Sequence, residues 1–250
     1  MIRALVYLLA ITAAEVTAVF QPLLGIAGHT IILVAVIIDS ARIRGYLQGR
    51  LILSLALVPL IRIISLSLPL ANIPRVWWYP IIYLPLLAAA IVLARLLDYR
   101  PKDIGISAGF IPVQLAIAVT GVGLGIAEYL ILSPEPLVAE LTWQSAWLPA
   151  LILLVSTGFV EEFIFRGVLQ RSAVNAFGGW GIVYIGFLFA VLHIGWIKAE
   201  NPLSWVDVFF VFAIALFFGW VVKKTGSLLG VSLSHGITNI MLFIVAPFFF

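Results

Sequence analysis

Two adjacent glutamates, Glu161 and Glu162, stand inside the apolar run 147–170. A carboxylate is costly to hold in such surroundings, so its presence there is a hypothesis of function. The chain has three histidines, and two of them, His193 and His235, also lie inside apolar runs. Carboxylates and imidazoles are the usual general acids and bases of enzymes. The sequence therefore predicts acid–base chemistry in an apolar environment.

Helical spacing indicates which of these residues contact one another. Glu162 and Arg166 are four residues apart, which places them on one helix face, and we expect them to form an ion pair. Glu161 then points elsewhere, and we expect His193 to be its partner. Each of these polar residues, taken alone, is more often a hydrogen-bonding link between helices than a catalytic group.

His235 and Asn239 are likewise four residues apart. Two such groups one turn apart suit the binding of a carbonyl oxygen and of the oxyanion that it becomes. Together with an acid and an imidazole they predict the attack of an activated water on an amide. The HExxH sequence is absent, which excludes the usual zincin geometry.

The composition is that of an integral membrane protein. Of 250 residues, 64% are apolar and 10% are charged, with a mean hydropathy of +1.21. A soluble domain has about a quarter charged residues. The net charge of +3 comes from basic residues between apolar runs, so we expect a lipid bilayer and no nucleic acid as partner. The absence of cysteine excludes disulfides and thiolate metal sites.

A spanning helix needs about 20 mostly apolar residues. Nine candidate spans meet that rule: 2–20, 23–38, 51–71, 76–97, 108–132, 147–170, 180–196, 204–222 and 227–250. The second is short, so eight spans is the alternative. Because the loops are brief, we predict an all-α polytopic helix bundle that forms a single domain, 1–250. Three glycines in the fifth span (Gly121, Gly123 and Gly125) would allow a neighbouring helix to approach closely.

The basic residues predict the orientation, since cytoplasmic loops carry the excess of Lys and Arg. One side receives eleven of them, and the other only Arg75 and Lys198. The eleven are Arg3, Arg42, Arg44, Arg50, Arg95, Arg100, Lys102, Arg166, Arg171, Lys223 and Lys224. This pattern places the N-terminus in the cytoplasm.

The polar residues share a depth. Counted along straight helices from the Lys/Arg-rich edge, Glu161 lies about 15 Å deep, His193 about 21 Å and His235 about 12 Å. We expect one site near the midplane that opens toward the Lys/Arg-rich side.

The predicted spans contain further charged residues, among them Glu15, Arg62 and Glu128. Glu15 and Arg62 lie at about 18 Å, which predicts a second ion pair inside the membrane with a structural role. Glu128 is expected near the interface at the outer end of its span.

The ordered motifs Glu161-Glu162-x-x-x-Arg166, Phe189-x-x-x-His193 and His235-x-x-x-Asn239 resemble those of the CAAX-protease and bacteriocin-processing family (CPBP, also called Abi). That family includes the type II CAAX prenyl endopeptidases. The resemblance covers about 100–250, which would be the catalytic core, and 1–97 would be variable N-terminal spans.

The resemblance implies a role for each motif residue. Glu161 and His193 would activate a water, and His235 and Asn239 would stabilise the oxyanion. Glu162 and Arg166 would support the site, with Phe189 packed beside it. Family members are called metalloproteases, so a divalent metal, zinc first, and a water activated by Glu and His alone both stay open.

The substrate implied by the resemblance is a protein or peptide, membrane-anchored or lipid-modified, and prenylated in the eukaryotic relatives. The compact, loop-poor chain is more similar to prokaryotic members, which implies a prokaryotic cell membrane. Two other function classes remain. His193 and His235 could be the axial ligands of a haem, and the intramembrane charges could serve a proton-coupled transporter or a scaffold.

Overall fold

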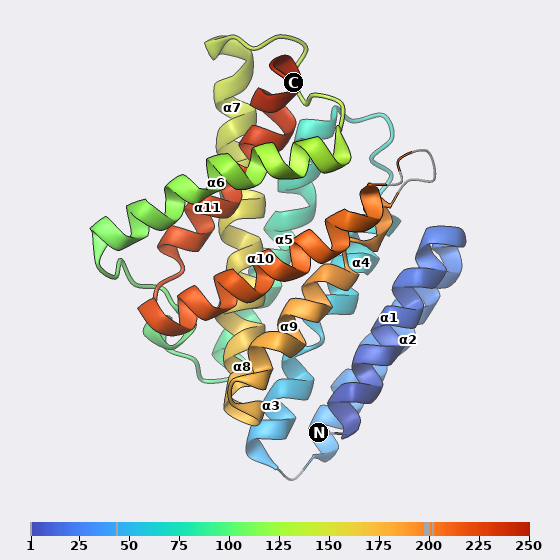
Figure 1. The fold of residues 1–250 in the computed structure, drawn as a ribbon. Coiled ribbons are helices and arrows are strands. Elements are labelled where there is room, and N and C mark those ends of the chain that lie inside the picture. Colours follow the sequence, from blue (N-terminus) through green and yellow to red (C-terminus); the bar gives the residue numbers. More distant parts are fainter. Residues whose placement is uncertain (1, 44, 198–200, 202) are drawn as a thin grey trace.

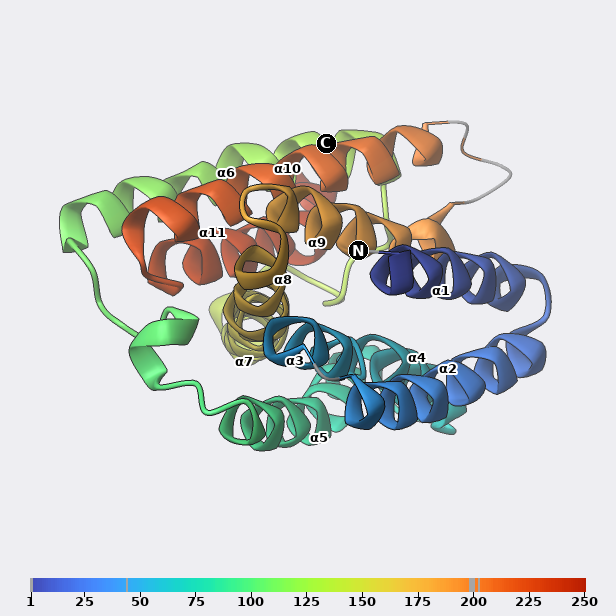
Figure 2. The same cartoon turned by 90° about the horizontal axis from the view of Figure 1, so that it is seen from below.

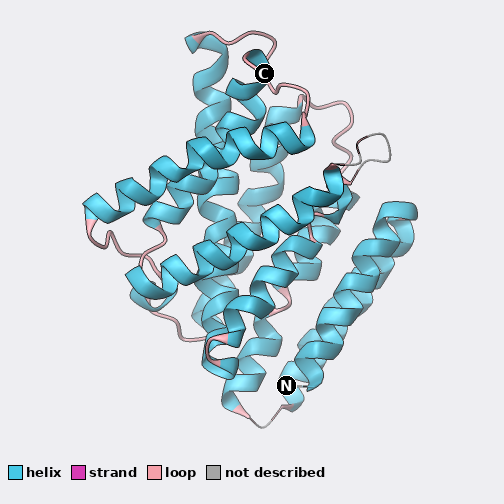
Figure 3. Ribbon diagram, viewed as in Figure 1, coloured by secondary structure: helices cyan, strands magenta, loops and turns pink. Residues whose placement is uncertain are grey.

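The computed structural model describes residues 2–43, 45–197, 201 and 203–250. The described residues form helices and loops and contain no strand (Figure 3), which confirms the all-α class. Arg44 and Lys198, two of the predicted loop charges, lie outside the described residues.

The described residues form eleven α-helices and six short 3₁₀ or π segments. The N-terminal helices are α1 (Ile2–Phe20), α2 (Pro22–Arg42), α3 (Tyr46–Ser54), α4 (Leu57–Ser67) and α5 (Arg75–Leu96), followed by η1 (Pro101–Ile104). The later elements are α6 (Ile111–Leu132), α7 (Trp143–Leu153), η2 (Leu154–Glu161), η3 (Phe163–Leu169), α8 (Gln170–Phe177), α9 (Trp180–Val191), η4 (Ile194–Trp196), α10 (Ser204–Thr225), α11 (Leu229–Ile240), η5 (Met241–Val245) and η6 (Ala246–Phe248).

Eight helical stretches of the described chain are long and apolar enough to cross a membrane. The doubtful second span, 23–38, is one of them, because its helix extends over Pro22–Arg42. The short span is instead 180–196, where α9 ends at Val191 and a 3₁₀ turn follows. His193 therefore lies between two helical segments, after the end of α9 and before the 3₁₀ turn η4.

The sixth span is longer than the predicted 147–170. It runs from Trp143 to Phe177, 35 residues, without interruption. Its central part is π-helical, in η2 and η3, on both sides of Glu162. The π-helix is rare and frequently marks a functional site. A count along a straight α-helix therefore describes neither the length nor the side-chain directions of this span correctly.

The helices form two layers with this long helix between them. Figures 1 and 2 show α6, α9, α10 and α11 on one side and α2–α5 on the other. The π-helical part contacts α5 from one layer and α9, α10 and α11 from the other. The carboxylates are thus covered from both sides by protein.

Large apolar side chains cover the outer surface of the bundle. Phe20, Leu84, Phe209 and Trp180 are each more than half exposed. A water-facing surface rarely carries apolar patches of this extent, whereas lipid-facing helices require them. The protein is an integral multi-pass membrane protein.

Two of the three glycines of α6 bring it against α11, as the sequence predicts. A Cβ atom on Gly121 would lie 2.3 Å from the Ser234 carbonyl oxygen, and one on Gly125 would lie 2.4 Å from the Met241 Cβ atom. Gly123 points away and has nothing within 4 Å of such an atom. The helix that carries His235 and Asn239 is therefore held against α6 at backbone distance.

Gly121→Ala is expected to destabilise the protein by about 1–3 kcal/mol, because the added methyl group forces α6 and α11 apart. Thermal unfolding of the purified protein in detergent measures the effect. Gly123→Ala is the matched control in the same helix, and it is expected to be neutral or slightly stabilising, since alanine favours helix more than glycine does. Equal melting temperatures for both variants would contradict the close contact.

Candidate active site

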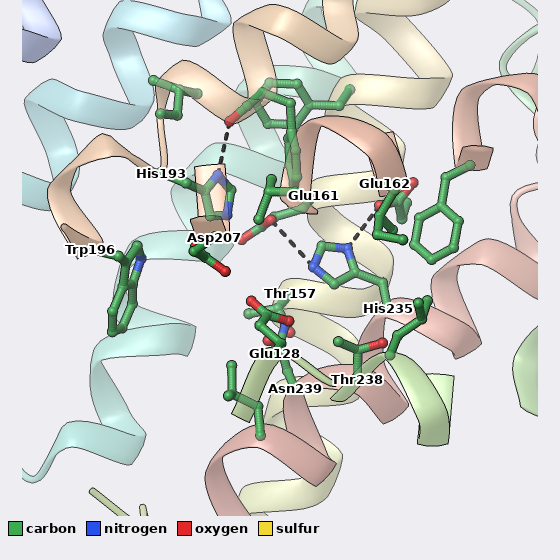
Figure 4. Close-up of a pocket in the computed structure, with 18 of the residues that line it drawn as sticks. Glu128, Thr157, Glu161, Glu162, His193, Trp196, Asp207, His235, Thr238 and Asn239 are labelled. Atoms are coloured by element: carbon green, nitrogen blue, oxygen red, sulfur yellow. Dashed lines mark hydrogen bonds and ion pairs between the residues drawn. The ribbon is translucent and has the colours of Figure 1, made fainter. Parts of the chain in front are cut away.

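All six predicted site residues line one cavity of about 190 Å³ near the middle of the bundle (Figure 4). The long central helix supplies Glu161, Glu162 and Arg166; the turn after α9 supplies His193; and α11 supplies His235 and Asn239. The residues are far apart in sequence, so only the fold brings them together.

Glu162 is the centre of a buried ionic network. Its side chain is fully buried, and its Oε1 atom lies 2.9 Å from the Arg166 guanidinium, the ion pair that the spacing predicts. The same oxygen lies 2.8 Å from His235 Nδ1. Phe189 packs beside the network as expected, with the Arg166 guanidinium 4.3 Å from its ring centre and the His193 ring 4.7 Å away. These contacts fix the orientation of the His235 ring.

Glu161 has other partners than the sequence suggests. The Tyr83 hydroxyl donates a hydrogen bond to its Oε1 atom, and its Oε2 atom lies 3.8 Å from His235 Nε2. The expected contact with His193 is thus replaced, among the described residues, by contacts with Tyr83 and His235. The reason lies in the helix break, where His193 Nδ1 turns back to the Phe189 carbonyl at 2.9 Å.

The two histidines differ in the protons that they can carry. His193 Nδ1 must donate, because the Phe189 carbonyl oxygen only accepts, so in the neutral ring Nε2 is an acceptor. His235 faces a carboxylate at each nitrogen, and Coulomb attraction from both stabilises its cationic form. His193 is accordingly suited to accept a hydrogen bond, and His235 to donate one.

Glu161 and His235 lie close enough for one group in the cavity to contact both. A separation of 3.8 Å between Oε2 and Nε2 exceeds a direct hydrogen bond. A water molecule bridging the two would contact both. Thr157, Thr238 and Asn239 line the same cavity and add neutral polar groups.

Three residues of the site escaped the sequence interpretation. Tyr83 bonds to Glu161, while Glu128 and Asp207 line the cavity from α6 and α10. Glu128 was expected at the membrane interface, but its side chain lies within the cavity (Figure 4). None of the three belongs to a spaced motif. For Glu128 and Asp207, the signal in the sequence is that each is an acidic residue inside an apolar span.

The predicted ion pair of the N-terminal spans is present and has a third member. Arg62 Nε lies 2.7 Å from Glu15, and His29 Nε2, for which no role was expected, lies 3.1 Å from the same carboxylate. Arg62 also lines the cavity and donates to the Leu192 carbonyl, next to His193. The site is therefore not confined to 100–250, because α4 and α5 contribute Arg62 and Tyr83.

The cavity reaches toward the ends of several helices. Its lining residues include Tyr79 near the start of α5, Leu132 at the end of α6, Trp196, Asp207 near the start of α10, and Phe243. The Lys and Arg count assigns these helix ends to the poorly basic side. An opening toward the Lys/Arg-rich side stays a prediction.

The predicted ligand set does not fit a metal ion in this arrangement. A zinc site requires at least three protein ligands around one ion. No three His, Asp or Glu side chains of the described residues are placed to hold one. His235 Nδ1 is occupied by Glu162, and Glu161 Oε1 by Tyr83.

A comparison with known families found a match in the segment that carries the motifs. Residues 143–241 match a family model described as type II CAAX prenyl endopeptidase Rce1-like. This segment is therefore similar to the CAAX-protease-like family. It contains all six predicted site residues and starts later than the 100–250 expected from the motifs. Neither the curated proteins nor the solved structures contain a match to the chain.

The match supports a general activity for this segment, that of a CAAX-type membrane protease. The family consists of membrane proteases, which are hydrolases acting on a protein substrate. The haem alternative lacks support, since both nitrogens of His235 face carboxylates. The transporter alternative has no observation in its favour beyond the intramembrane charges themselves.

Proposed function

We propose that the protein is an intramembrane endopeptidase in which Glu161 activates a water for attack on a peptide bond. The observation that carries the proposal is that Glu161 Oε2 and His235 Nε2 lie 3.8 Å apart on the wall of one cavity, which is lined by all three motifs. A base and an electrophilic donor that a group in the same cavity can contact together is the arrangement that peptide hydrolysis needs.

In the first step the Glu161 carboxylate takes a proton from the water, and the hydroxide bonds to the carbonyl carbon of the substrate. The carbonyl π electrons move to oxygen, which becomes an oxyanion. The cationic His235 ring, held by Glu162, donates Nε2–H to that oxygen, and the Asn239 amide adds a second donor. Donors that are already oriented stabilise developing charge strongly in a dry site.

In the second step the carbonyl re-forms and the C–N bond breaks. The leaving amine takes the proton held by Glu161, which restores the carboxylate. His193, with its acceptor Nε2, serves as a second base that orients the water beside Glu161. Tyr83 keeps the Glu161 carboxylate in position through its hydrogen bond. Arg166 balances the charge of Glu162 throughout.

The proposed substrate is a membrane-anchored or lipid-modified protein, with a prenylated tail as the first candidate. The location of the cavity among spanning helices supports it, since the peptide must enter the bilayer. The likeness to type II CAAX prenyl endopeptidases supports the prenyl group. The cavity is lined by Leu132 at the end of α6 and by Asp207 near the start of α10, so we propose that the peptide enters from the side of these helix ends.

The proposal is tested with purified protein in liposomes that also contain fluorescent peptides, prenylated or acylated. Mass spectrometry in H₂¹⁸O identifies the cleaved bond and requires one ¹⁸O atom in the new carboxyl terminus. The Glu161 variant described in the Discussion assigns the activity to this site. Absence of cleavage with every lipid-anchored peptide, by protein that is folded, would contradict the proposal.

Metal removal is expected to leave turnover unchanged, because the described side chains do not form a three-ligand site. The measurement is cleavage after incubation with 1,10-phenanthroline and removal of the chelator. The non-chelating 1,7-phenanthroline is the matched control. Loss of activity with the first reagent alone, restored by zinc, would assign a metal to the site and overturn this expectation.

A further inference from the structure

One end of the cavity carries two carboxylates that the proposed mechanism does not use. Asp207, in the first turn of α10, is 1% exposed, and neither of its carboxylate oxygens has a hydrogen-bond partner in the part of the chain that the structure describes. Glu128, from α6, lines the same cavity. Figure 4 shows both side chains in the cavity, beside Trp196 and Asn239.

The cations of the cavity wall are already paired. Arg62 is bound to Glu15, Arg166 to Glu162, and the His235 ring lies between Glu161 and Glu162. Among the described lining residues this leaves Glu128 and Asp207 without a compensating cation. Buried carboxylates without partners are costly, and a site of this kind is stabilised when a cation enters.

We infer that Glu128 and Asp207 form a subsite for a cationic side chain, lysine or arginine, next to the scissile bond of the substrate. This inference rests on the proposed endopeptidase function and adds to it a substrate specificity. A buried aspartate with two free oxygens, directed into the cavity that contains the proposed catalytic residues, is the observation that carries it.

The surroundings suit an organic cation. An ammonium group has three donors, which two carboxylates and the Asn239 side-chain oxygen can accept. Trp196 and Phe210 line the same end of the cavity and supply an apolar wall for the methylene chain of a lysine. A metal ion would need at least three closely placed ligands, and the described residues do not offer them here.

The small volume places the cation near the reaction. A cavity of about 190 Å³ is smaller than a usual pocket for a drug-sized ligand. Only the residues that flank the scissile bond can enter it. Because Asn239 and His235 line the same small cavity as the carboxylate pair, a bound basic side chain would hold the neighbouring carbonyl close to the proposed oxyanion donors (Figure 4).

The test uses lipid-anchored peptide pairs in which each position around the cleaved bond holds either lysine or norleucine, which has a similar length and no charge. At one position the wild-type protein is expected to cleave the lysine peptide about ten- to a hundred-fold faster in kcat/KM, as a charged hydrogen bond implies. Asp207→Asn and Glu128→Gln should bring the lysine-to-norleucine ratio close to one. A purely structural effect would lower both rates and leave the ratio unchanged.

A binding arm separates this inference from the proposed function. The affinity of the same peptides for the Glu161→Gln protein is measured by fluorescence anisotropy in detergent. If no peptide is cleaved, the endopeptidase proposal fails, and tighter binding of the lysine peptide still supports the subsite. Glu161-dependent cleavage with no preference at any position, or equal affinities for both peptides, overturns the subsite and leaves the proposed function intact.

Discussion

Replacing Glu161 with glutamine is expected to lower the turnover of lipid-anchored peptides by about a thousand-fold. The amide has nearly the shape of the carboxylate and can still bond to Tyr83, but it cannot take a proton from water. Because the side chain is only partly buried, the substitution should leave the melting temperature close to that of the wild type. Initial rates in proteoliposomes and thermal unfolding of the same preparation check both parts.

Glu140→Gln is the matched control for this substitution. Glu140 is exposed in the loop before α7, away from the cavity, so the same chemical change there should not affect turnover. Wild-type turnover in the Glu161→Gln protein would remove Glu161 from the mechanism. A folded protein in which both variants lose activity equally would also contradict the assignment, because the loss would then not depend on this cavity.

Replacing Arg166 with methionine is expected to cost about 3–5 kcal/mol of stability, since it leaves the Glu162 charge without its guanidinium partner. Glu162 is fully buried, and water cannot replace the lost contact. Its remaining polar contact is with His235 Nδ1. The His235 ring also faces Glu161, so its single positive charge is shared between two carboxylates. Equilibrium unfolding in mixed detergent micelles gives the free energy.

A double variant separates the lost charge pair from lost packing. Glu162→Gln combined with Arg166→Met removes both charges, so it should regain much of the stability that Arg166→Met alone loses. Arg171→Met, on the same long helix with a side chain 44% exposed, should change stability by no more than about 0.5 kcal/mol. If Arg166→Met is as stable as Arg171→Met, the buried ion pair is not important for the fold.

The sequence predicts the fold class well because long apolar runs leave few alternatives to spanning helices. It does not predict where a helix departs from regular α-helical geometry. Hydropathy measures how apolar a run is, and it does not detect the 3₁₀ turn after Val191 or the π-helical stretches of the central helix. These departures decide which way His193 and Glu161 point, so the pairing of Glu161 could not be predicted from spacing on a regular helix.

The candidate site was predictable only where residues recur at a fixed spacing. Glu162–Arg166 and His235–Asn239 are visible as pairs four residues apart, and both pairs line the cavity. Tyr83 and Asp207 are single polar residues in apolar runs, without a spaced companion. Their roles depend on which helices become neighbours, and that information comes from the packing of α5, α10 and the central helix.

The hydrogen bond from Arg62 to the Leu192 carbonyl has a consequence for the unit on which the protein works. The turn that presents His193 is fixed by a side chain outside the family-like segment, and that side chain is itself oriented by Glu15 and His29. A fragment trimmed to that segment would lose this support. Helices α1, α2 and α4 therefore take part in positioning the proposed site, and the segment 143–241 does not contain all of the residues that hold His193 in place.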